Sequence, residues 1–376
     1  MKIGIDCRLA GTQHAGIGRY IESLLTNLIK INSNINWVLF FHDENQAKTV
    51  LKKYFDNQKI QGELRSKRGY PGIKIVITPI SHYSIEEQLK LPKIFKAEKL
   101  DLLHVPHFNI PIFYSGKLVV TIHDLLWHEY KGGTATTLSP LKYFLKYIFY
   151  KVIVKFAVNK AKKIIVPAET IKQTVIKFYP ETKEKIVVTK EGADIWDKEI
   201  TTTKKLKKTL LYVGSLYPHK NIKIVLRALT ELETYKLLIV GSRNIFRENI
   251  ESFIKFKEIE DKVTFLGYLS DEKLAKLYSR VTALVQPSLS EGFGLTGLEA
   301  MSLKTPILAS NIPIFNEIYQ DVAYYFSPYS ETSFISAVHE LENDDKKRLD
   351  EGVKLAKSYS WTKMAKNTLE VYSEYQ

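Results

Sequence analysis

The stretch ALVQPSLSEGFGLTGLEAM, residues 283–301, contains the pattern that decides the fold. It opens with the short apolar run Ala283–Gln286, which is typical of a buried strand. Gly292 and Gly294 then mark a turn, and a helix is expected to follow it. A buried strand that leads through a glycine turn into a helix is half of a βαβ unit, and such units build parallel sheets.

The same alternation of short apolar runs and helical stretches recurs along the whole chain. In the first half the expected strands are Lys2–Asp6, Trp37–Phe41, Ile73–Thr78, Asp101–Val105, Leu118–His123, Lys163–Val166 and Ile186–Thr189. A polar, lysine-rich stretch at Asp197–Thr209 interrupts the pattern and is interpreted as a linker. The strands resume at Leu210–Val213, Leu237–Val240, Val263–Leu266, Ala283–Gln286 and Pro306–Ala309. We therefore predict an α/β protein with two doubly wound, Rossmann-like domains, residues 1–196 and 209–359.

The charge balance of the chain favours an anionic partner. Of its 376 residues, 55 are Lys or Arg and 41 are Asp or Glu, so the formal net charge is +14. Nucleic acid, a phosphorylated ligand and an acidic membrane surface would each suit this charge. The sequence contains no helix-turn-helix, zinc-finger or RNP pattern, so no nucleic acid is expected among the partners.

Cysteine content and hydropathy indicate the compartment. The single Cys7 excludes a disulfide within the chain and a zinc site built from cysteines, which favours a reducing environment. The opening residues Met1–Asp6 form a strand pattern rather than a signal peptide, and no apolar run reaches about 18 residues. We therefore expect a cytoplasmic protein without a spanning helix.

The loop after the first expected strand contains Gly16-Ile17-Gly18-Arg19-Tyr20. Ligands of doubly wound sheets bind beyond the carboxyl ends of the strands. A dinucleotide fingerprint needs G-x-G-x-x-G directly after the strand, but residues 7–15 intervene here and Ile21 replaces the third glycine. This pattern disfavours an NAD-dependent oxidoreductase, in which Asp43 would bind the ribose. The two glycines either serve a tight loop or direct the free N–H groups of a helix toward an anion.

Histidines lie near the expected strand ends of the first half. His123 ends the run Leu118–His123, where a side chain faces either a ligand or the core, and the pattern leaves both open. His104 and His107 are expected to line a pocket wall. No metal site is expected, because the spacing does not match H-E-x-x-H and the chain has no Asp-x-Asp pair.

Two glutamates bracket the glycine turn of residues 283–301. Glu291 precedes the expected helix, and Glu299 follows eight residues later, about two helical turns on. The amides of Gly292–Leu295 at the start of the helix would bind an anion. Most glutamates simply face solvent, but carboxylates also accept hydrogen bonds from ribose and hexose hydroxyls. A phosphate-binding turn between two carboxylates therefore favours a nucleotide-sugar ligand.

Together these motifs resemble the retaining, nucleotide-sugar-dependent glycosyltransferases of family 4. The matching stretches are Gly16–Tyr20, His123-Asp124, Tyr212–Gly214 with Lys220-Asn221, Glu291–Glu299 with its Phe293–Leu295, and Ser360–Ala365. The resemblance implies the GT-B architecture, in which two facing Rossmann-like domains hold the nucleotide-sugar cleft between them. It also implies that a last helix, residues 360–376, crosses back to the first domain. Arg8, Gly18–Tyr20 and Pro218–Asn221 are most similar to O-antigen and lipopolysaccharide mannosyltransferases.

The resemblance implies a role for each matched residue. Lys220 would neutralise the donor diphosphate, Glu291 would bind hydroxyls of the transferred sugar, and His123 would hold its primary hydroxyl near the reacting centre. Glu299 would bind the ribose. The other donor-binding residues that it implies are Gly16, Gly18, Ser215, Tyr268, Phe293, Gly294 and Leu295. Arg19 and His104 would lie on the acceptor side.

One position departs from the family pattern. Many members carry an arginine shortly before the lysine, whereas this chain has Gly214–Tyr217, so His219 or Arg243 would supply the second positive group. The resemblance implies catalysis by positioning and electrostatic stabilisation of the leaving diphosphate, without a metal or an enzymatic nucleophile.

The implied reaction moves a hexose, with mannose favoured, from a nucleotide diphosphate sugar such as GDP-mannose. The acceptor would be a glycan or a lipid-linked molecule in cell-surface polysaccharide or glycolipid synthesis. No cofactor is implied beyond this donor. The nearest alternative is another GT-B nucleotide-sugar enzyme, either an epimerase or a synthase, and the NAD-dependent oxidoreductase is a more distant one.

The segment SPLKYFLKYIFYKVIVKFAVNKAKK, residues 139–163, has seven lysines and no acidic residue. Lys142 and Lys146, and then Lys151 and Lys155, recur at helical spacing. The segment is either a core helix with a lysine-covered outer face or a helix that binds an anionic membrane. Both hold if one stripe packs inward while the other faces lipid. We expect the protein to associate peripherally with the inner face of a membrane.

Overall fold

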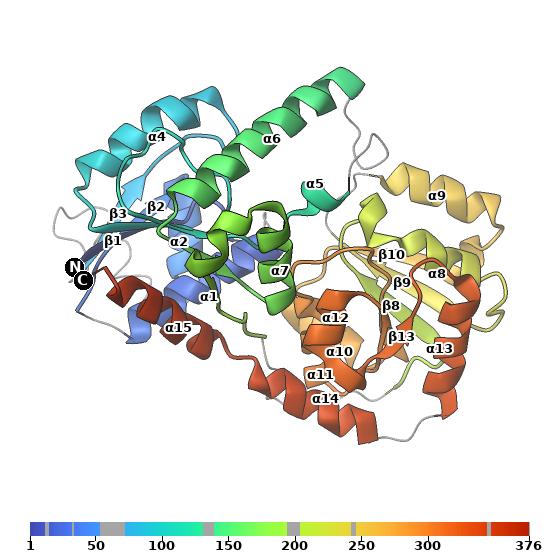
Figure 1. The fold of residues 1–376 in the computed structure, drawn as a ribbon. Coiled ribbons are helices and arrows are strands. Elements are labelled where there is room, and N and C mark those ends of the chain that lie inside the picture. Colours follow the sequence, from blue (N-terminus) through green and yellow to red (C-terminus); the bar gives the residue numbers. More distant parts are fainter. Residues whose placement is uncertain are drawn as a thin grey trace. The chain divides into compact units, whose positions relative to one another are not determined.

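The computed structural model describes residues 1–11, 15–31, 34–52, 72–130, 139–193, 204–241, 246–343 and 347–375 (Figure 1). The chain divides into two compact units. The first contains Met1–Leu125, Ser139–Gly192 and Ser360–Gln376, and the second contains Leu126–Leu138 and Ala193–Tyr359. The expected linker Asp197–Thr209 is described only from Lys204 onward.

The first unit is built on a parallel sheet in the order β3-β2-β1-β4-β5-β6-β7. Its strands are β1 (Lys2–Asp6), β2 (Asn36–Phe41), β3 (Ile73–Ile77), β4 (Leu102–Val105), β5 (Leu118–Thr121), β6 (Lys163–Val166) and β7 (Ile186–Val188). The strand order reverses between β1 and β4, which are paired in parallel. In an open α/β sheet this reversal is the topological switch point, where ligands bind.

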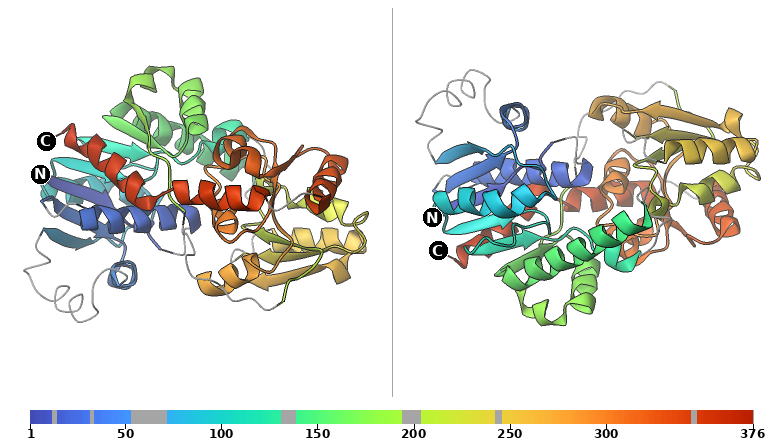
Figure 2. Two further views of the ribbon diagram at one scale, coloured as in Figure 1. Left: turned by 90° about the horizontal axis from the view of Figure 1, so that it is seen from below. Right: turned by 90° about the horizontal axis from the view of Figure 1, so that it is seen from above.

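Helices cover both faces of this sheet, as the crossover connections require. They are α1 (Ala15–Ile31), α2 (Glu44–Leu51), α4 (Ile85–Ala97), α6 (Pro140–Lys160), α7 (Glu169–Phe178) and α15 (Trp361–Ser373), with the 3-10 turn η3 (Pro180–Lys185). Ser84 caps α4 by accepting a hydrogen bond from the Glu87 amide at 3.0 Å. The chain-terminal helix α15 packs along α1 (Figure 2). Residues from both chain ends thus share one core.

The second unit repeats the plan with a parallel sheet in the order β10-β9-β8-β11-β12-β13. Its strands are β8 (Thr209–Val213), β9 (Lys236–Val240), β10 (Val263–Gly267), β11 (Ala283–Gln286), β12 (Ile307–Ser310) and β13 (Tyr324–Phe326). Its helices are α5 (Leu126–Glu129), α8 (Ile222–Ala228), α9 (Arg247–Phe256), α10 (Asp271–Tyr278), α11 (Leu295–Ser302), α12 (Pro313–Tyr319), α13 (Glu331–Asn343) and α14 (Lys347–Ser358), with the 3-10 turns η4 (Pro218–Lys220), η5 (Glu260–Lys262) and η6 (Gln320–Val322). Here the switch point lies between β8 and β11, which are also paired in parallel.

The central strands are buried throughout, as expected of parallel sheets with helices on both faces. In the second unit the core is made of Leu210, Leu237 and Val285 from the strands and of Val225 and Phe334 from the helices. The predicted α/β class with two doubly wound parallel sheets is confirmed. The prediction omitted β13, because a strand of three residues leaves little pattern in the sequence.

Candidate functional site

The glycine turn of residues 283–301 forms a rigid connection between β11 and α11. Gly294 precedes the helix with φ +104°, a left-handed conformation that favours glycine. A Cβ at Gly294 or Gly297 would lie 2.3 Å from the Tyr319 hydroxyl, so both positions must stay small. That hydroxyl lies 2.5 Å from Gln286 Oε1 and 2.7 Å from the Gly294 carbonyl. The first amides of α11 are therefore held in place at the carboxyl end of the sheet.

Glu291 and Lys220 meet at the switch point of the second sheet. Lys220 follows β8 and Glu291 follows the neighbouring β11, and Nζ lies 2.6 Å from Oε1. Ser288 donates a second hydrogen bond to the same carboxylate oxygen at 2.8 Å. The two side chains keep 22% and 17% of their surface exposed. Both charged groups therefore remain accessible to a ligand.

The surroundings keep Glu291 ionised. Burial alone would raise the pKa of this carboxyl, but the charge of Lys220 and hydrogen bonds from Lys220 and Ser288 hold its pKa below the ordinary value. A second contact fixes the geometry, because the amide of Leu289 donates to the His219 carbonyl at 2.7 Å. The loops that follow β8 and β11 thus form one structure around the ion pair.

His219, one of the two candidates for the second positive group, has surroundings that disfavour its charge. Burial and the adjacent charge of Lys220 lower the pKa of its imidazole to about 4. The ring is therefore uncharged at neutral pH. The other candidate, Arg243, lies outside the described residues.

Glu299 lies closer to the start of the helix than its sequence spacing suggested. Residues 287–294 do not belong to α11, which begins at Leu295, so Glu299 lies one turn into the helix rather than two turns beyond Glu291. Its side chain is buried. Phe293 is also buried and its ring packs against Tyr359 at 5.6 Å, which leaves only the backbone of Phe293 for a ligand.

The remaining donor-side residues lie at other strand ends of the second unit. Tyr268 is exposed directly after β10, where Gly267 adopts φ +67°. The carbonyl of Ser215, after β8, accepts a hydrogen bond from the Tyr212 hydroxyl at 2.5 Å. Leu295 is the first residue of α11 and is partly exposed.

In the first unit, Gly16 and Gly18 lie in the first turn of α1 and have different roles. Gly16 is exposed, and a Cβ there would contact nothing within 4 Å. At Gly18 a Cβ would lie 1.9 Å from the Gly11 carbonyl oxygen, so only glycine fits. Arg19 is partly buried in the same turn. The exposed Gly16 amide is thus the one that suits an anion.

His123 lies just beyond β5 in a polar, aromatic setting. Its Nδ1 is 3.1 Å from Glu191 Oε1, its Nε2 is 3.2 Å from the Pro106 carbonyl, and Tyr20 packs edge-on at 4.6 Å. A neutral imidazole donates through only one of its nitrogens. Sequence reasoning missed Glu191, although this carboxylate comes three residues after β7, at the edge where functional residues gather.

His104, which was predicted to lie on the acceptor side, is a core residue of the first unit. Its side chain is fully buried, with Nδ1 2.6 Å from the Tyr372 hydroxyl of α15 and Nε2 2.8 Å from Thr121 Oγ1. Burial, together with His123, lowers the pKa of His104 to about 3. Both ring nitrogens are therefore occupied within the protein.

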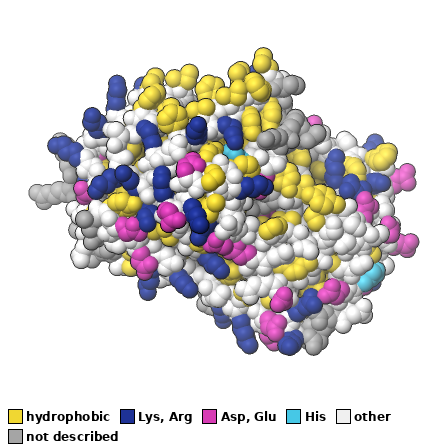
Figure 3. Space-filling model, in the orientation of Figure 1, with side chains coloured by type: hydrophobic (Ala, Val, Ile, Leu, Met, Phe, Trp, Pro, Cys, Tyr) yellow, Lys and Arg dark blue, Asp and Glu magenta, His cyan; other side chains and the backbone are white. Residues whose placement is uncertain are grey.

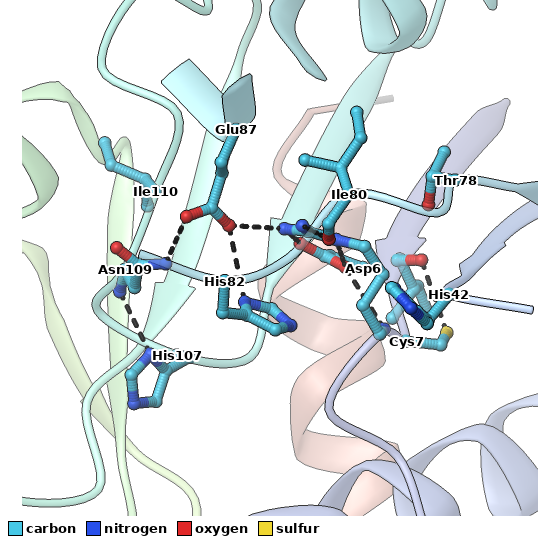
Figure 4. A network of polar contacts seen from close by, with 12 residues as sticks. Asp6, Cys7, His42, Thr78, Ile80, His82, Glu87, His107, Asn109 and Ile110 are labelled. Carbon is cyan, nitrogen blue, oxygen red and sulfur yellow. Dashed lines mark hydrogen bonds and ion pairs between the residues drawn. The ribbon is translucent and has the colours of Figure 1, made fainter. Parts of the chain in front are cut away.

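A buried charge network beside β1 was also missed (Figure 4). Arg8 Nη2 lies 2.7 Å from both Asp6 Oδ2 and Glu87 Oε1. Asn109 donates to Glu87 Oε2 at 2.8 Å. Burial opposes the ionised form of both carboxyls. The charge of Arg8 and its hydrogen bonds hold the pKa of Asp6 below its ordinary value, and a hydrogen bond from His82, the charge of Arg8 and a hydrogen bond from Asn109 do the same for the pKa of Glu87. The network joins the end of β1 to α4 and to the loop after β4.

Within the described ranges no three His, Cys, Asp or Glu side chains gather as a metal site requires. Lys220 is the cation at the glycine turn, and in the same unit α11 begins at the partly exposed Leu295. The chemistry that this arrangement offers is recognition of an anion that also carries hydroxyl groups.

Comparison with known proteins gives consistent matches for both halves. Residues 15–196 match the family described as Glycosyltransferase Family 4, and residues 195–354 match Glycosyl transferases group 1. The chain is 30% identical to the O-antigen chain mannosyltransferase RfbU of Salmonella typhimurium, over 71% of this chain and 72% of that protein. It is 33% identical to the O-antigen chain mannosyltransferase B of Escherichia coli, over 43% of this chain and 45% of that protein. Alr3699/HepE of Anabaena, solved with UDP-glucose, has the same GT-B fold at a TM-score of 0.72, with 16% identity over 100% of both chains.

Proposed function

Because the chain belongs to glycosyltransferase family 4, we propose that it transfers mannose from GDP-mannose to a glycan or lipid-linked acceptor during O-antigen or lipopolysaccharide synthesis. The observation that carries the proposal is the accessible Lys220–Glu291 pair beside the first turn of α11. The names of RfbU and of mannosyltransferase B support mannose. The complex of HepE with UDP-glucose supports a nucleotide-sugar donor in general.

In the proposed site the ion pair opens to bind the donor. Lys220 donates to the diphosphate in place of Glu291, together with the amides at the start of α11. Glu291 then accepts hydrogen bonds from hydroxyls of the transferred sugar, and Glu299 from the ribose. Lys220 and the helix start supply the positive charge, so we infer that no divalent metal is required.

The proposed reaction retains the configuration of the sugar. The bond between the anomeric carbon and the diphosphate oxygen breaks, and the acceptor oxygen forms its bond on the same face. The acceptor proton passes to the departing diphosphate, so no enzymatic nucleophile takes part. His123 holds the primary hydroxyl of the sugar, and Glu191 positions the His123 ring. Catalysis then comes from positioning and electrostatic stabilisation.

Thermal unfolding with single ligands tests the donor. GDP-mannose at 100 times its Kd should stabilise the protein by about 2.7 kcal/mol, whereas NAD should leave the melting temperature unchanged. If only UDP-glucose stabilised the protein, the donor would be UDP-glucose instead of GDP-mannose. If only NAD stabilised it, the protein would be an oxidoreductase. A mass-spectrometric transfer assay with a lipid extract as acceptor then identifies the product.

We also propose that α6 associates peripherally with the inner face of an anionic membrane. Seven large apolar side chains of α6 are 40% to 70% exposed: Leu141, Phe144, Leu145, Ile148, Phe149, Val152 and Phe156. Figure 3 shows hydrophobic side chains along the upper edge of the view, over α4 and α6, with basic side chains below them. No helix within the described residues is long and apolar enough to span a bilayer.

The exposed apolar residues of α6 lie on one side of a helix whose opposite side is also apolar. At 100° per residue the seven apolar side chains fall on one stripe. Lys142 and Lys146 lie on one edge of the stripe, and Lys151 and Lys155 lie on the other. The opposite face contains the buried Val154 and packs into the first unit. An apolar stripe between two rows of lysines suits a bilayer interface, where each lysine contributes about 1 kcal/mol.

Vesicle sedimentation tests this association. Wild-type protein should bind phosphatidylglycerol vesicles in a salt-sensitive way, and changing Lys142, Lys146, Lys151 and Lys155 to Glu should abolish most binding. Lys236, Lys255, Lys273 and Lys354 of the second unit, changed to Glu together, form the matched control. Equal binding by the two quadruple variants would mean that α6 has only a structural role.

A further inference from the structure

A surface pocket of about 280 Å³ lies between α4 and the loop that joins β4 to β5. Gln88, Leu89, Lys93 and Lys96 line it from α4, and Phe113 and Ser115 line it from the loop. Gln88 holds the loop at a fixed distance. Its amide nitrogen donates to the Ile110 carbonyl at 3.3 Å, and its amide oxygen accepts from the Ile112 amide at 2.8 Å. The pocket is therefore formed before any ligand arrives.

The charge in this pocket is positive and uncompensated. No acidic residue lines it, and within the described residues neither Lys93 nor Lys96 forms an ion pair. Lys90 of the same helix differs, because Glu86 lies 2.6 Å from it. Lys160 adds a further cation near the loop by donating to the Tyr114 carbonyl at 3.2 Å. Two free ammonium groups at one concave site suit an anion such as phosphate.

The rim of the pocket is apolar, which indicates what carries the anion. Phe113 and Leu89 are 63% and 56% exposed, and Ile85 is exposed one turn before Leu89. A free phosphate ion gains nothing from such neighbours, whereas a phospholipid presents a phosphate next to acyl chains. The same loop contacts α6, because the Phe108 ring packs against Tyr150 of α6 at 5.2 Å. Both helices lie on the same side of the first unit (Figure 1).

We propose that this pocket binds the head-group phosphate of an anionic membrane lipid. Lys93 and Lys96 contact the phosphate, and Leu89 and Phe113 enter the interface beside it. The inference rests on the membrane association proposed for α6 and extends it from one helix to a face with two contacts. Two contacts fix the orientation of the first unit on the bilayer, which a single helix does not.

Vesicle binding of paired variants tests the pocket. Lys93→Gln/Lys96→Gln should bind phosphatidylglycerol vesicles roughly tenfold more weakly than wild type. The control Lys48→Gln/Lys90→Gln removes the same charge from lysines that are paired with Glu44 and Glu86, and it should bind within about twofold of wild type. Equal weakening of both variants would mean that only net charge matters and would overturn the pocket.

Two further measurements separate the sources of the anion. With Phe113→Trp, lipids brominated in their acyl chains should quench the new fluorescence, and no quenching would overturn the contact of the rim with lipid. Soluble glycerol phosphate should not compete at millimolar concentration. A different result would be that glycerol phosphate binds in a way that depends on Lys93 and Lys96 while these lysines have no effect on vesicle binding. That result would assign the pocket to a free phosphate compound and overturn the lipid assignment.

The result can be read independently of the other proposals. Lys93→Gln/Lys96→Gln should keep the wild-type thermal shift with GDP-mannose, because none of the residues proposed to bind the donor lines this pocket. Failure of GDP-mannose to stabilise any variant would remove the donor proposal and leave the vesicle result intact. If only the α6 variant lost vesicle binding, the lipid role of the pocket would be overturned and the membrane association of α6 would stand. If the wild-type protein did not bind vesicles, both proposals would be overturned.

Discussion

Both units have the same reversal of strand order, and in both a cluster of charged side chains lies beside it. The two clusters differ in burial. Asp6 and Arg8 at the end of β1 meet Glu87 of α4, and the side chains of these three residues are 4%, 0% and 0% exposed. Lys220 and Glu291 follow β8 and β11 and keep about a fifth of their surface exposed. A ligand can replace one partner of the partly exposed pair, whereas the charges of the buried cluster already satisfy one another. The buried cluster of the first unit therefore positions loops, and the Lys220–Glu291 pair of the second unit is suited to binding.

Removal of the central cation should have the largest effect on stability. Arg8→Met leaves two carboxylates buried without their partner, which should lower the free energy of unfolding by about 3–5 kcal/mol. Urea unfolding followed by circular dichroism measures this loss. Lys220→Met is the matched change in the partly exposed pair and should cost less, about 1–2 kcal/mol, because the carboxylate of Glu291 that it leaves behind still reaches solvent. Similar losses in the two variants would remove the contrast between the clusters.

The exposed pair should instead dominate activity. Lys220→Ala and Glu291→Ala should each lower the transfer rate by about 10²–10³-fold while the fold stays intact, because each removes one preorganised charged contact. Lys304→Ala breaks the exposed ion pair with Asp350 elsewhere in the same unit and is the control for charge loss. Wild-type turnover in a folded Lys220→Ala variant would refute the diphosphate role.

Acid should destabilise the protein through its uncharged histidines. The pKa of His104 is about 3 and that of His219 about 4, both below the ordinary value near 6.5. From about pH 6.5 down to these native pKa values, the unfolded chain binds protons at the two histidines and the native protein does not. The free energy of unfolding therefore falls as the pH falls below about 6.5. Each group contributes at most about 1.4 kcal/mol per pH unit.

Urea unfolding from pH 7 to pH 4.5 measures this slope. His104→Gln should flatten it by the contribution of one group, and His219→Gln should do the same for the second unit. An unchanged slope in both variants would show that other groups control the acid response. Asp6 and Glu87, whose pKa values are lowered, add to the loss as the pH falls below about 5.

The smallest expected effect is that of a chelator. Turnover should be unchanged in EDTA, because Lys220 and the start of α11 supply the positive charge at the diphosphate. Rates measured with and without EDTA, and after addition of manganese, check this. Turnover that vanished with the chelator and returned with manganese would require a different description of the site.

Local pattern predicted most of the secondary structure but not the environment of each side chain. The alternation of apolar runs and helices located strands such as β1 and β11, because each strand makes its pattern within a few residues. His104 and His123 both follow this pattern near strand ends, yet one is a core residue and the other keeps partial exposure. Their difference depends on Tyr372 and Glu191, which lie far away in the sequence.

The sequence by itself determined the two parallel sheets, the glycine turn before α11 and the lysine-rich helix, since these depend on neighbouring residues. Only the tertiary structure decided that Lys220 meets Glu291 across 71 positions and that Arg8 is buried between two carboxylates. It also left the apolar stripe of α6 exposed instead of covering it. The physical reason is that burial and ion pairing depend on which strands and helices become neighbours, and adjacency of that kind is not contained in any short segment.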